Sequence, residues 1–279
     1  MVLDVLLDSF LDVIKIIPFL FVIYFLLEWM ESEAGHHMEH FLERHHRLNP
    51  VIGSVLGLIP SCGFAGAASS LFATGVISAG TLIAIYLSSS DEMISIMVSM
   101  HAPFDKVWPI LITKLIVAII AGLGIDLLTK QRKIDVEDFC HREHDDHSHG
   151  ILYSAIMHTI QVSIWLLVIT IVFNFIVTLI GEDTLRLFVT SHPNQSVFVA
   201  SLVGLIPSCA SSILLTTMYL DGVISFAAVC AGLLVNAGTG MMVLWRVHPN
   251  YKENIMILLA TWLCGLIAGG IIEFLTILF

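Results

Sequence analysis

Gly57-Leu58-Ile59-Pro60-Ser61-Cys62 recurs in this chain as Gly204-Leu205-Ile206-Pro207-Ser208-Cys209, an offset of 147 residues. At the same offset, Gly75-Val76-Ile77-Ser78 recurs as Gly222-Val223-Ile224-Ser225 without a gap. Scattered matches of Leu, Ile and Ala between apolar helices arise by chance, but two runs in one register that include Pro and Cys rarely do. The chain is therefore predicted to be an internal tandem repeat.

The composition is that of a membrane protein. Of the 279 residues, 57 % are hydrophobic and 13 % are charged, whereas soluble domains carry about 25 % charged residues. A bilayer core about 30 Å thick needs about 20 apolar helical residues, and the apolar blocks have that length: 13–29, 51–72, 76–100, 107–128, 151–180, 197–220, 223–245 and 255–279. We expect an all-α, multi-pass protein of the cell (inner) membrane, surrounded by the lipid bilayer.

Several other classes are excluded. Lys and Arg number 12 against 23 Asp and Glu, so there is no basic surface for nucleic acid. Four of the five cysteines lie in apolar stretches, which argues against a disulfide scaffold. The chain contains neither a P-loop nor a Gly-x-Gly-x-x-Gly motif, so we expect no nucleotide and no cofactor.

Each Pro-Ser-Cys motif interrupts its apolar block. Proline lacks the N–H group and breaks a helix, and Pro60 follows Pro50 by ten residues, which is about 15 Å of helix, half a bilayer. The block is therefore either one kinked crossing or a re-entrant hairpin with its tip at Pro60–Gly63.

The positive-inside rule favours hairpins. With two hairpins, one side of the membrane collects eight basic residues, namely Arg44, Arg47, Lys130, Arg132, Lys133, Arg142, Arg246 and Lys252. The other side keeps only Lys15, Lys106 and Arg186. Each repeat then has three crossings plus one hairpin, so the two repeats are inverted, and both termini are extracytoplasmic. We expect a first repeat at 1–130 with a cytoplasmic His-rich linker at 30–50, a second cytoplasmic linker at 131–150, and a second repeat at 151–279.

The strongest polar cluster inside an apolar block is Ser88-Ser89-Ser90-Asp91-Glu92. Acids in hydrocarbon are expensive and by default mark an ion site, a proton relay or a paired charge. The equivalent stretch of the second repeat is Asn236-Ala237-Gly238-Thr239-Gly240, where glycines open the backbone and Asn and Thr offer oxygens. The plainer interpretation is that Asp91 or Glu92 only neutralises Lys114.

The two tips supply hydroxyls, thiols and free N–H groups, from Ser61 and Cys62 in one repeat and from Ser208, Cys209 and Ser211 in the other. Helix ends attract ions, and thiols suit soft metals or trivalent arsenic. Alternatively, the small residues only allow close backbone packing. Lys114 lies within an apolar block, where it either extends to the membrane surface, pairs with the acids, or meets an anionic substrate.

Histidines crowd the two polar linkers. One linker carries His36, His37, His40, His45 and His46, and the other carries His141, His144, His147 and His149. Imidazole suits transition metals, so these histidines are candidates for peripheral metal capture or sensing. A solvated polar linker is the alternative.

Inverted repeats with broken segments at matching positions point to a secondary transporter with a site near the midplane. We predict that the site lies between the two tips and the two breaks, and its candidate residues are Ser61, Cys62, Ser88, Ser89, Ser90, Asp91, Glu92, Lys114, Ser208, Cys209, Ser211, Asn236 and Thr239. For a hard cation, the metal ligands would be Asp91, Glu92 and Asn236.

At these motifs the chain resembles a bacterial family of ten-segment heavy-metal exporters, also described as arsenic efflux proteins or manganese transporters. The residues that carry the resemblance are 57–63, 75–78 and 88–92 in the first half, and 204–209, 221–225 and 243–246 in the second. The resemblance implies that the protein exports an inorganic ion, but the descriptions of the family differ in the ion that they name.

Several alternatives stay open at this point. The cargo is either a divalent metal such as manganese or an oxyanion of the arsenite or phosphate type. A proton or sodium ion would be the coupling ion, and a homodimer is allowed. A channel is the next class, and an intramembrane enzyme is the least favoured because no histidine lies close in sequence to either tip.

Overall fold

The computed structural model describes residues 49–58, 62–89, 93–129, 151–180, 195–207 and 209–278, together with single residues between 10 and 25. Throughout these ranges the regular structure is helical, and strands are absent from the described part. The all-α prediction is therefore confirmed for these residues.

The helix boundaries repeat along the chain. The first set is α3 (Asn49–Gly57), α4 (Cys62–Ala73), α5 (Ala79–Ser88), α6 (Met93–Ser99) and α7 (Phe104–Leu128). After α9 (Ile151–Ile180), the second set is α11 (Ser196–Gly204), α12 (Cys209–Leu220), α13 (Phe226–Val235), α14 (Thr239–Val247) and α15 (Tyr251–Leu278). Both ends of α3, α4 and α5 recur 147 residues later in α11, α12 and α13, so the repeat extends from the sequence to the local structure.

The turns that precede α5 and α13 form in the same way. Gly75 has φ 80° and Gly222 has φ 73°, a left-handed conformation that glycine adopts without steric cost. Ser78 then accepts a hydrogen bond from the backbone N–H of Thr81, and Ser225 accepts one from Ala228. Each serine thereby satisfies one of the free N–H groups at the start of its helix.

Glycines let the helices of each repeat pack backbone to backbone. A Cβ at Gly57 would collide with the Ser88 hydroxyl, and one at Gly53 would lie 3.1 Å from side-chain carbons of Thr81 and Ile85, so α3 runs beside α5 in the same direction. In the second repeat, a Cβ at Gly204 would collide with the carbonyl oxygen of Gly232, the residue 147 positions after Ile85. The close contacts therefore also keep the register of the repeat.

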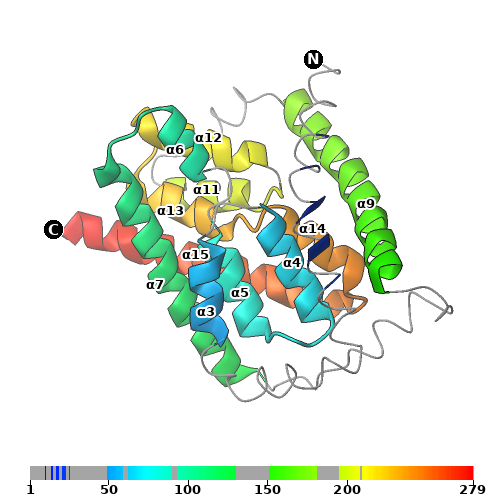
Figure 1. Ribbon diagram of the computed structural model, residues 1–279. Helices are drawn as coiled ribbons and strands as arrows, with labels where there is room; N and C mark the ends of the chain where they lie inside the picture. Colours follow the sequence, from blue (N-terminus) through cyan, green and yellow to red (C-terminus); the bar gives the residue numbers. More distant parts are fainter. Residues whose placement is uncertain are drawn as a thin grey trace.

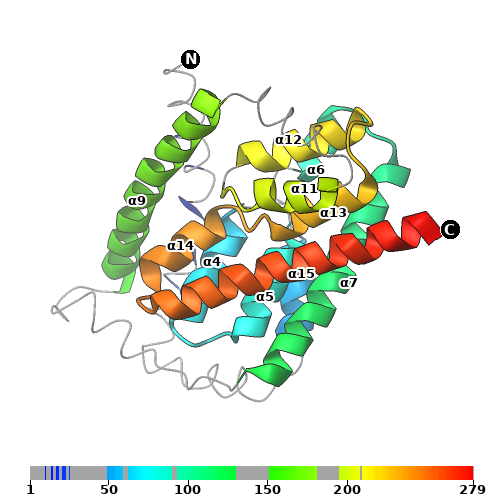
Figure 2. The ribbon, with the colours of Figure 1, turned by 180° about the vertical axis from the view of Figure 1, so that it is seen from behind.

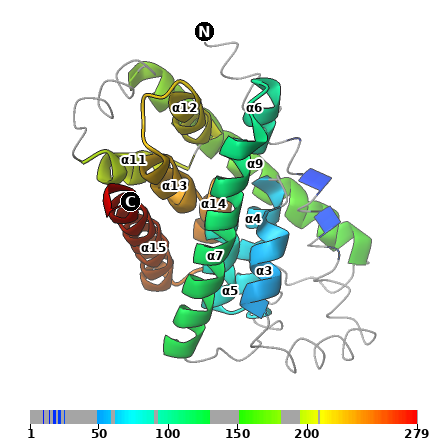
Figure 3. The same ribbon diagram turned by 90° about the vertical axis from the view of Figure 1, so that its left-hand side faces the viewer.

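The longest helices cover the outside of this core. Figure 2 shows α15 running lengthwise across the face of the molecule, over α13 and α5. Figure 3 shows α7 running down from α6 through the middle of that view, in front of the other helices. In Figure 1, α9 stands at the edge, beside α14. In the described ranges, three segments are long and apolar enough to cross a membrane: Phe104–Leu128, Phe226–Val247 and Tyr251–Thr276.

The predicted helix interruptions are confirmed. The helix before the first Pro-Ser-Cys motif ends at Gly57 and the next begins at Cys62, and the second motif separates α11 from α12 at the equivalent residues. The breaks also fall where the sequence places them, because α5 ends at Ser88 and α13 ends at Val235. Every short helix is thus a half-crossing in length, about 10 to 18 Å.

The two repeats interlock through α4 and α14. A Cβ at Gly240, in the first turn of α14, would lie 2.7 Å from the Cβ of Ala65. Seven residues further along α4, the ring of Phe72 contacts the ring of His248, with 5.3 Å between centroids. The half-helix that follows the first tip therefore packs along the half-helix that follows the second break, and both run in the same direction.

Candidate transport site

In the second repeat, side chains join the start of α12, which follows the Pro-Ser-Cys motif, to the break after α13. The Nδ2 group of Asn236 donates a hydrogen bond to the Oγ of Ser211, at 3.3 Å, and that hydroxyl in turn contacts the carbonyl oxygen of Ile206 at 3.0 Å. Asn236 is the cap residue directly after α13, and Ser211 lies in the first turn of α12. Both are buried, and so is Thr239, with which α14 begins.

The backbone at this break is open because Asn236 and Gly238 leave the helical conformation. Gly238 has φ 52°, and its N–H donates to the Oδ1 atom of Asn236 at 3.0 Å. The Asn236 amide thus stabilises the turn with its oxygen and reaches the tip with its nitrogen. The resulting cluster of buried hydroxyl, amide and carbonyl groups is suited to holding an ion.

In the first repeat, the described part of the cluster is Ser88 and Ser89. Both are buried, and the Ser88 hydroxyl donates to the carbonyl oxygen of Ile85 at 3.1 Å. Gly57, the last residue before the first tip, lies against Ser88. The end of α3 and the end of α5 therefore meet at the same level.

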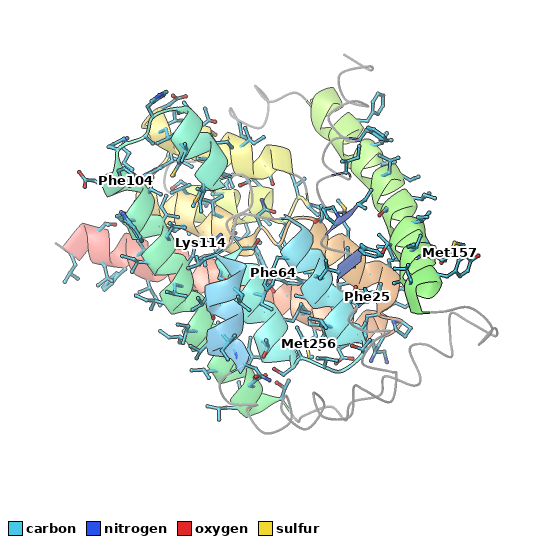
Figure 4. The ribbon with its side chains drawn as sticks, viewed as in Figure 1. Phe25, Phe64, Phe104, Lys114, Met157 and Met256 are labelled. Carbon is cyan, nitrogen blue, oxygen red and sulfur yellow. The ribbon has the colours of Figure 1, made fainter. Side chains whose placement is uncertain are left out.

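Lys114 connects the first repeat to the break of the second. Its ammonium group donates a hydrogen bond of 2.7 Å to the backbone carbonyl of Leu233, in the last turn of α13. Figure 4 labels this side chain midway along α7. With 1 % of its surface exposed, Lys114 does not extend to the membrane surface, so that alternative is wrong.

The remaining candidates lie outside the described residues. These are Ser61, Ser90, Asp91, Glu92 and Ser208, and the linker histidines His36, His37, His40, His45, His46, His141, His144, His147 and His149. Cys62 and Cys209 are the first residues of α4 and α12, but the description does not extend to their side chains. Within the described ranges, no three His, Cys, Asp or Glu residues cluster closely enough to hold a metal.

One buried polar junction was missed by sequence reasoning. The Ser69 hydroxyl lies 2.7 Å from the Tyr86 hydroxyl and 2.7 Å from the carbonyl oxygen of Gly240. A sequence signal existed, because Thr216 stands 147 residues after Ser69 and carries a hydroxyl at the matching position. The other partner, a backbone carbonyl, has no signal in the sequence.

Comparison with known proteins gives one family. A family model described as "Putative, 10TM heavy-metal exporter" matches residues 1–169 and, in a second overlapping region, residues 149–276. A search of curated proteins finds no match. A search of solved structures also finds none.

Proposed function

The chain belongs to the 10TM heavy-metal exporter family, whose model covers most of its length, and from this premise we propose that it is a secondary-active exporter of an inorganic cation. The family is a class of membrane transporters rather than of enzymes, and its substrates are inorganic ions. The finer proposal is that the cargo is a divalent metal such as manganese or another heavy metal, and that the protein lies in the cell membrane.

The family match is the observation that carries this proposal, and the tip-to-break contact supports its location. Asn236 and Ser211 join one hairpin tip to one broken helix in a buried place. Broken half-helices that present polar groups near the membrane centre are how many secondary transporters hold an ion. We propose that Asp91, Glu92 and Asn236 provide oxygen ligands, with the tip hydroxyls of Ser61 and Ser208 beside them.

Helix directions support the re-entrant hairpins. Gly53 and Gly57 pack beside successive turns of α5, so α3 and α5 run the same way. The five residues 74–78 link α4 to α5, and the Ser69 hydroxyl, one turn before the end of α4, meets Tyr86. This pairing is what an antiparallel α4 and α5 would give, and it requires the chain to reverse between α3 and α4.

The same contacts support inverted repeats. Because α4 runs with α14 and against α5, α14 runs against α5, and α14 prolongs α13 across the break. The helices α5 and α13, which are equivalent in the two repeats, would then point in opposite directions. At the other end of the molecule, the ammonium of Lys106 lies 5.6 Å from the centre of the Tyr219 ring, so the start of α7 meets the end of α12 there. In this arrangement both His-rich linkers, 30–50 and 131–150, are cytoplasmic.

The test is binding and flux with purified protein. Isothermal titration with Mn²⁺, arsenite and phosphate would be compared for the wild type, Asp91→Asn and Glu92→Gln, and flux would be measured in proteoliposomes under a proton or sodium gradient. A cation exporter should bind Mn²⁺ and lose this binding in Asp91→Asn. Unchanged binding and flux in both variants would remove these acids from the site. Flux that neither saturates nor responds to a counter-ion gradient would indicate a channel.

An oxyanion exporter is the second candidate, and the buried ammonium of Lys114 is the observation that favours it. In that case Lys114 and the N–H groups at the tips would bind the anion, and a carboxyl group would carry a proton. Asp91→Asn would then keep arsenite or phosphate binding and lose only the dependence of transport on pH.

A further inference from the structure

We propose that the Lys114 ammonium is an internal cation that takes the cargo's place between transport events, and that the exported cation displaces it from the carbonyl end of α13. This inference rests on the proposed cation export and adds to it the means by which the empty carrier is stabilised.

The position of Lys114 is unusual for a lysine. A charged side chain inside a membrane protein is expensive to bury and needs a partner of opposite polarity. Within the described residues no other lysine is buried, since Lys106 is partly exposed and Lys252 is exposed. Its ammonium group lies inside the protein and donates to the Leu233 carbonyl. The buried position therefore calls for a function that is specific to this charge.

The Leu233 carbonyl, which Lys114 contacts, is a group that would also attract a metal cation. The break after Val235 ends α13. The Asn236 N–H still bonds to the Gly232 carbonyl, but the Gly238 N–H turns to the Asn236 side chain, so the carbonyls that follow Gly232 lose the N–H donors that a continuing helix would supply. These carbonyls form the negative end of the helix dipole, where cations are stabilised. Unwound carbonyls and half-helix C-terminal ends are also where transporters coordinate ions. An ammonium on the Leu233 carbonyl and a cargo cation at this break would therefore compete.

The two repeats differ at this position. The residue 147 positions after Lys114 is Thr261, and its hydroxyl donates within its own helix to Ile257, at 2.8 Å. Lys114, in α7 of the first repeat, instead contacts α13 of the second repeat, at a residue 119 positions later in the sequence. The ammonium thus joins the two units that have to move relative to each other during alternating access, and its equivalent in the other repeat makes no such link.

An exporter has to return to the cytoplasmic side without its cargo. Without a cation, the Leu233 carbonyl at the end of α13 would lose the charged donor that it has in the structure, and burying a polar group without its partner disfavours that state. Lys114 supplies a positive charge there and allows the empty carrier to change conformation. When cargo arrives, it has to displace the ammonium, so its apparent affinity is lowered by the fraction of carriers in which Lys114 occupies the position.

The test compares Lys114→Met and Lys114→Gln with the wild type. If the Lys114 ammonium occupies the carbonyl end of α13 in about nine-tenths of the cargo-free carriers, removing its charge should tighten Mn²⁺ binding by about tenfold in titration calorimetry. In proteoliposomes, exchange of external for internal Mn²⁺ should continue, whereas net efflux should fall by at least about tenfold, because the empty carrier no longer returns. Lys114→Gln keeps a hydrogen-bond donor for Leu233 and is the variant to use if Lys114→Met does not fold.

Two matched controls separate this role from packing. Thr261→Val changes the equivalent buried residue of the other repeat, and Lys106→Met removes a lysine in the first turn of α7, the helix that carries Lys114. Both should leave the ratio of net efflux to exchange unchanged. Weaker or unchanged Mn²⁺ binding in both Lys114 variants, or an equal loss of exchange and net efflux, would overturn the inference while leaving cation export intact. If the wild type moves arsenite or phosphate and no Mn²⁺, the proposed function itself fails.

Discussion

The Ser69 hydroxyl lies 2.7 Å from the carbonyl oxygen of Gly240, 171 residues further along the chain. This contact joins α4 of the first repeat to α14 of the second, next to the place where Ala65 and Gly240 touch. The equivalent helices α12 and α6 also contact each other, but less extensively. The equivalent hydroxyl, on Thr216, is buried and has no hydrogen-bond partner among the described residues. The α4–α14 contact is therefore the more strongly bonded of the two.

Ser69→Ala and Thr216→Val should affect stability differently. Removing the Ser69 hydroxyl leaves the buried Tyr86 hydroxyl without this partner, which should cost about 1–3 kcal/mol. Thr216→Val replaces an unpaired buried hydroxyl by a methyl group of similar size, so it should be neutral or stabilising. Thermal unfolding in detergent would measure both, and equal losses would contradict the difference in bonding.

Gly240→Ala should weaken the interface between the repeats. The added Cβ would lie 2.7 Å from the Cβ of Ala65 and 2.9 Å from its carbonyl oxygen, so α4 and α14 would have to separate. Overpacking of this kind costs about 1–3 kcal/mol. Gly270→Ala is the matched control, because nothing lies within 4 Å of its added Cβ. A Gly240→Ala variant as stable as this control would show that the interface can adapt.

Asn236→Ala should reduce cation affinity by about tenfold or more, since one side chain both holds the turn at Gly238 and contacts Ser211. Asn250→Ala, which removes an exposed amide after α14, serves as control. Titration with Mn²⁺ gives both affinities. Equal affinities in the two variants would place the ion away from this break.

Replacing the nine linker histidines by serine should leave the maximal flux largely unchanged and alter metal affinity or regulation. The linkers lie outside the predicted crossings, so their imidazoles cannot line a site at the midplane. Flux at saturating Mn²⁺ in proteoliposomes is the measurement. A stably folded variant that transports nothing would make these histidines part of the transport step.

Single cysteines in the turns at 75–78 and 222–225 should be labelled from opposite sides of the membrane. Inverted hairpins require the first turn to be cytoplasmic and the second extracytoplasmic. Labelling by a membrane-impermeant thiol reagent, in a background without the native cysteines, gives the side of each turn. Labelling of both from one side would exclude inversion.

The sequence by itself determined the membrane class, the tandem repeat and the positions where helices are interrupted. These features are local: hydropathy decides which segments enter the bilayer, Pro60 and Pro207 remove backbone donors wherever they stand, and Gly75 and Gly222 permit a positive φ in any context. Hydropathy and a search for segments that recur at a fixed offset are enough to find these features in a single sequence.

Only the tertiary structure decided which of these elements meet. The partner of Lys114 is a backbone carbonyl, and Gly240 likewise contributes its carbonyl to Ser69. Every residue carries a backbone carbonyl, so the sequence could not single out these two. The sequence allows three interpretations of Lys114, because a lysine in an apolar block can extend to the surface or stay inside, and the choice depends on which groups the neighbouring helix places beside it. In the structure the ammonium lies inside, where the Leu233 carbonyl in the last turn of α13 accepts its hydrogen bond.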